Sequence, residues 1–429
     1  MIRIIRDSLT KRDEIFSVKE AKTDVSATVA EIIERVRREG DSALYYYTER
    51  FDRAHLSSLR VSEEEIREAT EATDPELIRV LRLAAENITA FHKMQKTDGF
   101  ELRPKDGVII GQKVIPVDCA GLYVPGGTAA YPSTVLMDAI PAKLAGCPRV
   151  VMVTPPSKEG KVNPVILAAA HVAGVDEIYK VGGAQAIAAL AYGTESIPKT
   201  DKIVGPGNAY VAEAKRQVYG TVSIDMIAGP SEIMVIADKD NRPCDIAADL
   251  LSQAEHDKMA SAVLVTDSEW LAESVARELE RQIPLLERSE IARISIDTNG
   301  KIIITDSLEE AVEIANGIAP EHLELCVKEP FLYLEKVRHA GSVFLGGYCP
   351  EALGDYLAGT NHTLPTSGTA RFSSPLSVDD FVKKTQYIYY DKNALGEVAR
   401  DVEYFAKKEG LTAHARSAVI RFEDEAEAK

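Results

Sequence analysis

The sequence predicts an α/β protein with two Rossmann-like domains, each an incomplete Rossmann fold on a parallel sheet, plus small helical segments at the N- and C-terminal ends. Three observations predict this class. From about residue 130 to 346, short apolar runs alternate with helical stretches, which is the rhythm of a parallel sheet flanked by helices. Glycine-rich turns follow several of these runs. Charged, amphipathic helices precede and follow the alternating part.

The first hundred residues are expected to be helical. In "DVSATVAEIIERVRREG" the apolar residues follow the helical period, and Gly40 marks the C-terminal end; they are Val25, Val29, Ile32, Ile33 and Val36. A second amphipathic helix is expected from Asp74 to Lys96, with His92 on its polar surface. The strand-like stretch "KVIPVDCAGLYVPGG" follows and ends in a loop.

Two series of strands and helices come next. In the first, "RVVMVTP", "EIYKVGG" and "KIVGPGN" each precede an alanine-rich helix. In the second, "SEIMVIAD", "SAVLVT" and "KIIIT" precede helices, the last of which begins at a capping box from Ser307 to Glu310. "EHLELCV" and "AGSVFLG" complete this series, and charged helices with a frayed acidic end are expected after it. Two successive α/β series predict two domains.

We expect four segments. Residues 1–20 would be an N-terminal tail, and residues 21–128 with 232–376 a larger, discontinuous α/β domain. Residues 129–231 would be a smaller inserted Rossmann-like domain, and residues 377–429 a C-terminal helical segment.

Composition excludes several partners and sites. A net charge of −17 argues against nucleic acid or an anionic membrane as the main partner. The five cysteines include no CxxC pair, so neither a disulfide framework nor a thiolate zinc cluster is indicated, which suits a reducing compartment. The N-terminal "MIRIIRDSLTKRDEIF" lacks the apolar core of a signal peptide, and no run approaches the ~18 apolar residues of a membrane span. A cytoplasmic protein is therefore expected.

Glycine-rich turns at strand ends could bring the backbone close to a ligand. "YVPGG", "KVGGAQ" and "VGPGN" are such turns, at the carboxyl ends where parallel sheets bind ligands. None is a GxGxxG, because Tyr210 occupies the third glycine position after Gly205 and Gly207. From the pattern alone, a nucleotide site and tight turns without a ligand both stay open.

Polar residues suited to metal binding or acid–base chemistry occur in four places. In chain order these are Gln253 with His256, Glu321 with His322, Asp355 with His362, and Glu409 with His414. Gln253 and His256, three positions apart, share a helix face. Adjacent strand residues point to opposite faces, so Glu321 and His322 can serve one site only at an irregular strand start, which Pro320 favours.

Each place also has a structural interpretation. Gln253 and His256 could cap a helix end, and Asp355 could be an N-cap behind Gly354. Glu321 and His322 could be a solvated pair, and His414 an exposed helix residue. Zinc accepts imidazole and carboxylate ligands, but glutamine is an uncommon ligand and no HExxH is present. Spacing alone leaves both interpretations open.

Several long strings in a fixed order resemble the histidinol dehydrogenase family. They are "IDMIAGPSEIMVIAD", "ADLLSQAEHD", "APEHLEL", "GDYLAGTNHTLPT" and "LTAH", and the resemblance covers essentially the whole chain. It implies oxidation of L-histidinol through L-histidinaldehyde to L-histidine in two NAD-dependent steps, the last reactions of histidine biosynthesis. Differences from the family are confined to neighbouring positions such as Thr363 and Arg416, and to the acidic tail.

The resemblance implies the following site residues. One zinc ion would be held by Gln253, His256, Asp355 and His414, with His322 as general base and Glu321 activating water for the second step. Ser231, His362 and Glu409 would contact the substrate together with His322 and the four zinc ligands. Tyr123, Gln185 and Asn208 would contact NAD. The resemblance also implies a homodimer whose C-terminal segment is a dimerisation tail, with His414 and Glu409 reaching the partner's site.

Three alternatives remain at this point. A related zinc enzyme could oxidise another small alcohol, or a zinc hydrolase could use Glu321 as its base. A metabolite-binding protein without catalysis is the third. Reduction of NAD distinguishes the dehydrogenases from the hydrolase, and tolerance of changes at Glu321 or His322 would favour the binding protein.

Overall fold

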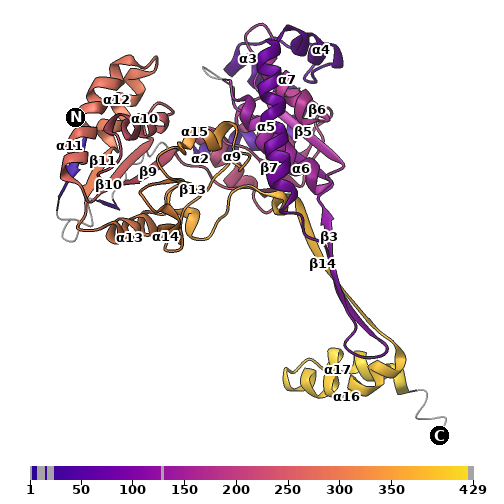
Figure 1. Ribbon diagram of the computed structural model, residues 1–429. Coiled ribbons are helices and arrows are strands. Elements are labelled where there is room, and N and C mark those ends of the chain that lie inside the picture. The colour runs from indigo at the N-terminus through magenta and orange to yellow at the C-terminus, as the bar shows by residue number, and fades with distance from the viewer. Residues whose placement is uncertain (1, 7–14, 17–23, 127–129, 424–429) are drawn as a thin grey trace. The chain divides into compact units, whose positions relative to one another are not determined.

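The computed structural model describes residues 2–6, 15–16, 24–126 and 130–423 (Figure 1). The chain forms two compact units. Unit 1 comprises Met1–Lys96 and Val117–Phe381, and unit 2 comprises Thr97–Pro116 and Val382–Lys429. Unit 1 contains two parallel sheets with helices on their faces, so the predicted α/β class with two Rossmann-like sheets is confirmed. No described helix has the length and apolarity needed to cross a membrane.

The first sheet of unit 1 has six parallel strands in the order β1-β11-β10-β9-β12-β13. Their bounds are β1 Arg3–Ile5, β9 Glu232–Ala237, β10 Ser261–Thr266, β11 Lys301–Ile304, β12 His322–Cys326 and β13 Ser342–Leu345. The start of the chain, expected to be a tail, supplies an edge strand instead: Ile4 pairs with Ile302 of β11. Only three residues long, this strand is too short for a periodic signal.

Helices cover both faces of the six-stranded sheet. α10 (Pro243–Ala254), α11 (Glu269–Gln282) and α12 (Ser289–Thr298) pack on one face with Ile233 and Val235 of β9. α13 (Leu308–Ile318) packs on the other face with Met234 and Ile236. The alternation along β9 therefore divides its side chains between two apolar cores, as a doubly covered strand requires. Ser307 caps α13 as predicted, its hydroxyl accepting a hydrogen bond from the amide of Glu310.

The second sheet has five parallel strands in the order β6-β5-β4-β7-β8. Their bounds are β4 Cys119–Tyr123, β5 Arg149–Thr154, β6 Glu177–Lys180, β7 Lys202–Val204 and β8 Ser223–Ile224. One face carries α2 (Ser26–Glu39), α3 (Asp41–Asp52), α8 (Gly183–Tyr192) and α9 (Ala209–Val218). The other carries α4 (Glu63–Ala72), α5 (Pro75–Lys93), α6 (Pro132–Ala145) and α7 (Pro164–Ala173).

This packing differs from the expected segments. The five-stranded sheet begins with β4 at Cys119, ahead of the expected boundary at 129. The helices from α2 to α5 pack on this sheet, although they were assigned to the domain that contains residues 232–376. The apolar stripe of an amphipathic helix shows that one face is buried, but it does not show which sheet covers that face. The sequence therefore predicted these helices but not the sheet on which they pack.

The position predicted for the His92 side chain is wrong. It was placed on the polar surface of its helix, but the side chain is fully buried near the end of α5. Its Nδ1 atom lies 2.6 Å from Oε1 of Gln95. Burial lowers the pKa of His92, and the ring belongs to the packing of the helix end.

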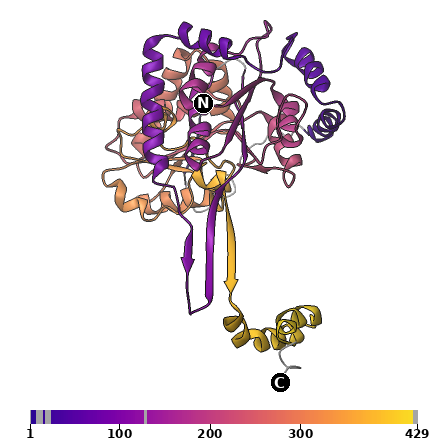
Figure 2. The same ribbon diagram turned by 90° about the vertical axis from the view of Figure 1, so that its right-hand side faces the viewer.

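Unit 2 consists of an antiparallel sheet and a pair of helices. The sheet has the order β14-β3-β2, with bounds β2 Phe100–Leu102, β3 Val108–Pro116 and β14 Val382–Tyr390, and Figure 2 shows β3 and β14 side by side along their length. α16 (Lys392–Lys408) and α17 (Thr412–Val419) follow. β14 was not predicted from the sequence, because its residues are partly or fully exposed on both faces and show no apolar alternation.

Candidate functional site

The site is centred on His322, whose ring is held in one tautomer. Nδ1 of His322 lies 2.9 Å from the backbone carbonyl oxygen of Glu232. A carbonyl only accepts, so Nδ1 carries the hydrogen and Nε2 of the neutral ring keeps its lone pair. Nε2 is buried and has no hydrogen-bond partner within the described part of the chain. The imidazole is therefore preorganised to take a proton at Nε2.

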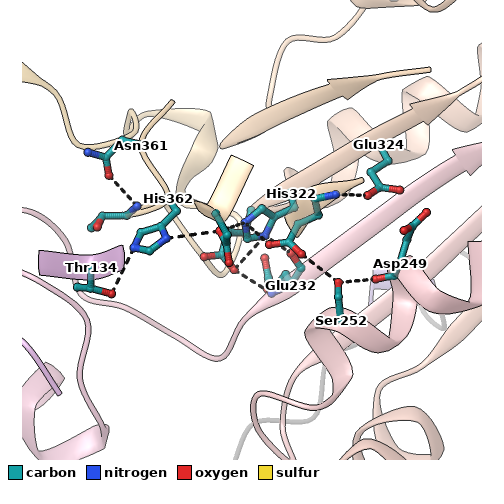
Figure 3. A network of polar contacts seen from close by, with 12 residues as sticks. Thr134, Glu232, Asp249, Ser252, His322, Glu324, Asn361 and His362 are labelled. Carbon is teal, nitrogen blue, oxygen red and sulfur yellow. Dashed lines mark hydrogen bonds and ion pairs between the residues drawn. The ribbon is translucent and has the colours of Figure 1, made fainter. Parts of the chain in front are cut away.

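Carboxylates surround this ring (Figure 3). Oε1 of Glu351 lies 3.7 Å and Oδ1 of Asp355 4.0 Å from Nε2 of His322, while Oε2 of Glu321 lies 3.6 Å from Nδ1. Burial, with Asp355 nearby, raises the pKa of Glu351 to about 7, against the opposing effects of His322 and Gln253. A positive charge that forms on the ring would be stabilised here.

Glu321 reaches the site because β12 starts irregularly. The strand begins at His322, and Ala319 just before it has a left-handed backbone with φ of 55°. Glu321 turns its Oε2 to the backbone amide of Glu232 at 2.9 Å. Burial raises the pKa of Glu321 well above its ordinary value. Both Glu321 and His322 are buried, so the irregular start is confirmed and the solvated pair is wrong.

Asp355 and His362 form the side of the site that faces the five-stranded sheet. Asp355 lies inside α15 (Glu351–Tyr356), whose N-cap is Pro350, so Asp355 is not an N-cap. Burial acts to raise the pKa of Asp355, but the bond to His362 and nearby histidines lower it to about 2. Nδ1 of His362 lies 3.6 Å from Oδ1 of Asp355, and its Nε2 lies 3.3 Å from Oγ1 of Thr134 on α6.

The loop after α15 ties the two sheets together beside the site. Asn361 donates from Nδ2 to the backbone carbonyl of Met137 on α6 at 2.7 Å. Thr363 donates its hydroxyl to Oδ1 of Asp138 at 3.0 Å. Figure 3 shows Asn361, His362 and Thr134 on the same side of His322. The position of His362 thus depends on both sheets.

Gln253 and His256 approach the same carboxylates from the end of α10. Gln253 lies in the last turn, fully buried, and its Nε2 has no hydrogen-bond partner among the described residues. His256 follows two residues after the helix end. Burial lowers the pKa of His256, while Asp355 acts in the opposite direction. The helix end therefore faces the site rather than only closing the helix.

The donor set suits a divalent cation. Three ligand atoms, one each from His322, Glu351 and Asp355, lie within 4.8 Å of one another. Within the described ranges, Nε2 of His322 and Oε1 of Glu351 are buried without hydrogen-bond partners. Buried polar atoms are normally paired, and imidazole and carboxylate ligands suit zinc. The residues in unit 1 thus fit a metal such as zinc.

Glu351 was missed by the sequence analysis. Its signal is the spacing to Asp355, four positions later on one face of a short helix. The Oε2 atom of Glu351 accepts from Ser252 at 2.9 Å, and its backbone amide donates to Oε1 of Glu324 at 2.7 Å. Ser252 precedes Gln253 on α10, so Glu351 links that helix end to α15.

The site lies at the amino ends of its strands. Glu232 and His322 are the first residues of β9 and β12. This differs from the usual position of ligands in parallel sheets, which is at the carboxyl ends of the strands. On this side α6 of the five-stranded sheet contacts the site, since Oγ1 of Thr134 lies 3.3 Å from Nε2 of His362.

A cavity of about 1110 Å³ lies at the carboxyl ends of the five-stranded sheet. Tyr123, Gln185 and Asn208 all line it. Tyr123 ends β4 and Asn208 follows β7. These strands are neighbours, and the strand order reverses between them, which is the usual ligand position in such sheets. The structure thus brings the three residues expected to contact a cofactor to one cavity.

The turns at this cavity are held by buried polar contacts. The hydroxyl of Tyr123 accepts from the backbone amide of Gly183 at 3.1 Å, and Asn208 caps α9. Gly205 has φ of 112°, and a Cβ there would lie 2.1 Å from the carbonyl oxygen of Tyr123. Lys215 donates to the carbonyl of Gly205 at 3.0 Å and pairs with buried Asp225, which accepts from the amide of Gly205 at 2.8 Å.

The remaining predicted residues lie elsewhere. Ser231 immediately precedes β9, next to Glu232, and its carbonyl accepts from the amide of Ser261. Glu409 is the C-cap residue directly after α16 and His414 lies in α17, both exposed and both in unit 2. His414 therefore has the exposure that the structural interpretation expected.

Comparisons with known proteins agree over nearly the full length. The family model for histidinol dehydrogenase matches residues 17–422. A histidinol dehydrogenase of Bacillus cereus is 59% identical over 94% of this chain and 93% of its own. One from Clostridium acetobutylicum is 53% identical over 98% of this chain and 99% of its own. The crystal structure of histidinol dehydrogenase from Elizabethkingia anophelis, 40% identical, covers 99% of both chains with a TM-score of 0.94.

Proposed function

The chain belongs to the histidinol dehydrogenase family of oxidoreductases, and on this basis we propose that it oxidises L-histidinol through L-histidinaldehyde to L-histidine while reducing two NAD. These are the last steps of histidine biosynthesis, and a cytoplasmic location suits them. The observation that carries the proposal is the unpaired Nε2 of His322 beside Glu351 and Asp355, with Glu321 beside the other ring nitrogen.

His322 acts as the general base of the first oxidation. Its Nε2 takes the hydroxyl proton of the alcohol as hydride leaves for the cofactor. The carbonyl of Glu232 keeps the other nitrogen protonated, so the ring does not change tautomer between turnovers. Glu351 and Asp355 stabilise the imidazolium that results.

Glu321 serves the second oxidation. An aldehyde must be hydrated before a second hydride can leave, and this step needs a base for water. Burial raises the pKa of Glu321, which makes its carboxylate a stronger base than an exposed one. His322 and Glu321 therefore divide the two half-reactions.

The metal ligands are Gln253, His256 and Asp355 from one chain and His414 from the partner. Zinc supplies no redox chemistry; when bound, it holds the substrate's imidazole and amino nitrogens in place. The low pKa of Asp355, which keeps its carboxylate ionised, and the buried position of Gln253 in the last turn of α10 support this assignment. Ser231, His256 and His362 complete the substrate contacts, with Glu409 of the second copy.

NAD occupies the cavity of the five-stranded sheet. Tyr123, Gln185 and Asn208 line it, and Oε1 of buried Gln185 has no partner within the described residues, so it is available to a ligand donor. Ala130 lines the same cavity four residues before Thr134, which contacts His362. The nicotinamide end is thereby directed toward the substrate.

A homodimer is the proposed assembly, with unit 2 as the dimerisation segment. The exposed apolar side chains of this unit are Phe100, Leu102, Ile388, Tyr389, Tyr390, Val402, Tyr404, Phe405, Leu411 and Ile420. So many exposed apolar side chains on so small a unit are typical of an interface. Glu409 and His414 are exposed residues of the same unit, and in the proposed dimer they would enter the second copy's site.

An assay on histidinol tests the function. Purified protein should form two NADH for each L-histidinol consumed, lose this activity with a chelator and regain it with zinc. Zinc-dependent hydrolysis of an ester without NADH would instead favour a hydrolase. Faster turnover of another small alcohol would assign the substrate differently.

Glu321→Gln should separate the two half-reactions. The amide cannot take a proton from water, so oxidation of L-histidinaldehyde should fall by about 10²-fold or more, while the first hydride transfer changes little. Single-turnover measurement of NADH from histidinol and from the aldehyde checks this. Equal loss in both half-reactions would contradict the division between Glu321 and His322.

A further inference from the structure

The last turn of α3 presents a carboxylate to the cofactor cavity, and one of its oxygens has no partner among the described residues. Asp52 ends this helix and lines the cavity. Its Oδ2 atom is buried and has no hydrogen-bond partner in the part of the chain that the structure describes. A buried carboxylate oxygen without a donor is costly, and a bound ligand is one way to satisfy it.

The position is electrostatically unfavourable without a ligand. The C-terminal end of a helix carries partial negative charge, which disfavours an anion there. Burial raises the pKa of Asp52 to about 6. A neutral residue would be more stable in this place, so a carboxylate here is better explained by binding than by folding.

The neighbours of Asp52 suit an adenosine group. Phe51 is 50% exposed, lines the cavity and stacks on Tyr47, with ring centroids 5.5 Å apart and an angle of 12°. Such a ring offers a flat surface for a purine. The other charged residues that line the cavity are Glu31, Arg50, Lys158 and Lys161. The three cations suit a diphosphate, whereas a free carboxylate suits a sugar diol.

The fold indicates which half of the dinucleotide lies here. α3 packs with α2, α8 and α9 on one face of the five-stranded sheet, while α6, which carries Thr134, packs on the other. Since the nicotinamide must lie toward the Thr134–His362 contact, the adenosine half lies toward α3. This step rests on the proposed function.

We propose that Asp52 accepts hydrogen bonds from the hydroxyl groups of the adenosine ribose and thereby selects NAD over NADP. A 2′-phosphate would replace one of the donors by a group of charge about −1.5 to −2 and set it against the carboxylate. The charge and the hydrogen bond thus act in the same direction, toward the unphosphorylated cofactor.

Two variants separate these effects. Asp52→Ala removes the acceptor, so the dissociation constants of NAD and ADP-ribose should rise about 10- to 100-fold, while that of nicotinamide mononucleotide stays unchanged. Asp52→Asn removes the charge but keeps one acceptor oxygen, so the preference for NAD over NADP should fall at least about 10-fold. Calorimetric titration of the full-length protein measures both without turnover. Glu49→Gln, on the exposed side of α3, is the charge-matched control and should change neither.

Stability gives a readout that a structural role would not give. If Asp52 serves binding, Asp52→Asn should keep or raise the melting temperature at pH 7 while selectivity falls. A lower melting temperature with unchanged selectivity would overturn the proposal, as would an unchanged affinity for ADP-ribose in Asp52→Ala. If wild-type protein reduces neither NAD nor NADP with histidinol, the proposed function fails, but the titrations still decide the role of Asp52.

Discussion

His322→Asn should lower the rate of the first hydride transfer by about 10²- to 10⁴-fold, the usual contribution of a positioned general base. Asparagine can keep the bond to the carbonyl of Glu232 through its amide, but it offers no basic nitrogen where Nε2 stands. Binding of histidinol and zinc should change far less than the rate, because the other predicted ligands remain. Stopped-flow measurement of the first NADH, beside metal analysis, tests both statements.

The control for this variant is Phe344→Leu. Phe344 packs near the His322 ring, with centroids 6.0 Å apart, without a polar group. This change should affect the rate only modestly, so a large loss in both variants would indicate disturbed packing rather than a lost base. A wild-type rate in His322→Asn would remove His322 from the mechanism.

Mixing two inactive variants should restore activity. In a homodimer with shared sites, His322→Asn and His414→Ala damage different subunits of the same site. A mixed dimer holds one site with both changes and one site with neither. Random exchange of subunits should therefore return about a quarter of wild-type activity, from almost none in either parent.

The experiment needs unfolding and refolding, or coexpression, of the two chains. His414→Ala alone should also lose zinc on dialysis, since one predicted ligand is missing. As a control, either single variant is mixed with a double variant that carries both His322→Asn and His414→Ala. This mixture should restore no activity, because every site then holds at least one change. No recovery in the first mixture, with mixed dimers present, would contradict the contribution of His414 to a partner's site.

The fold was largely predictable from local patterns. The βα series and both parallel sheets follow from apolar runs and glycine turns, which are short-range signals. β1 and β14 were not predictable in the same way, because one is three residues long and the other has no buried face. The packing of the helices from α2 to α5 on the five-stranded sheet was also missed, since an apolar stripe does not show which sheet will cover it.

The candidate site was predictable in part. The sequence identified candidate polar residues suited to metal binding or acid–base chemistry, among them Gln253, Glu321, His322 and Asp355. The family resemblance supplied their roles. Spacing alone could not show that they converge, because they come from three parts of the chain far apart in sequence: α10, the start of β12 and α15. Glu351 was missed although it lies four positions before Asp355. Asp52 was missed because what marks it, a buried oxygen without a partner among the described residues, is a property of the folded chain.

The bond from Asn361 to the backbone of Met137 bears on how the enzyme can change over evolutionary time. A contact to a main-chain carbonyl is indifferent to the side chain at position 137. Unlike the contacts of Thr134 and Asp138, which depend on their side chains, this bond between the loop after α15 and α6 would survive a substitution of Met137.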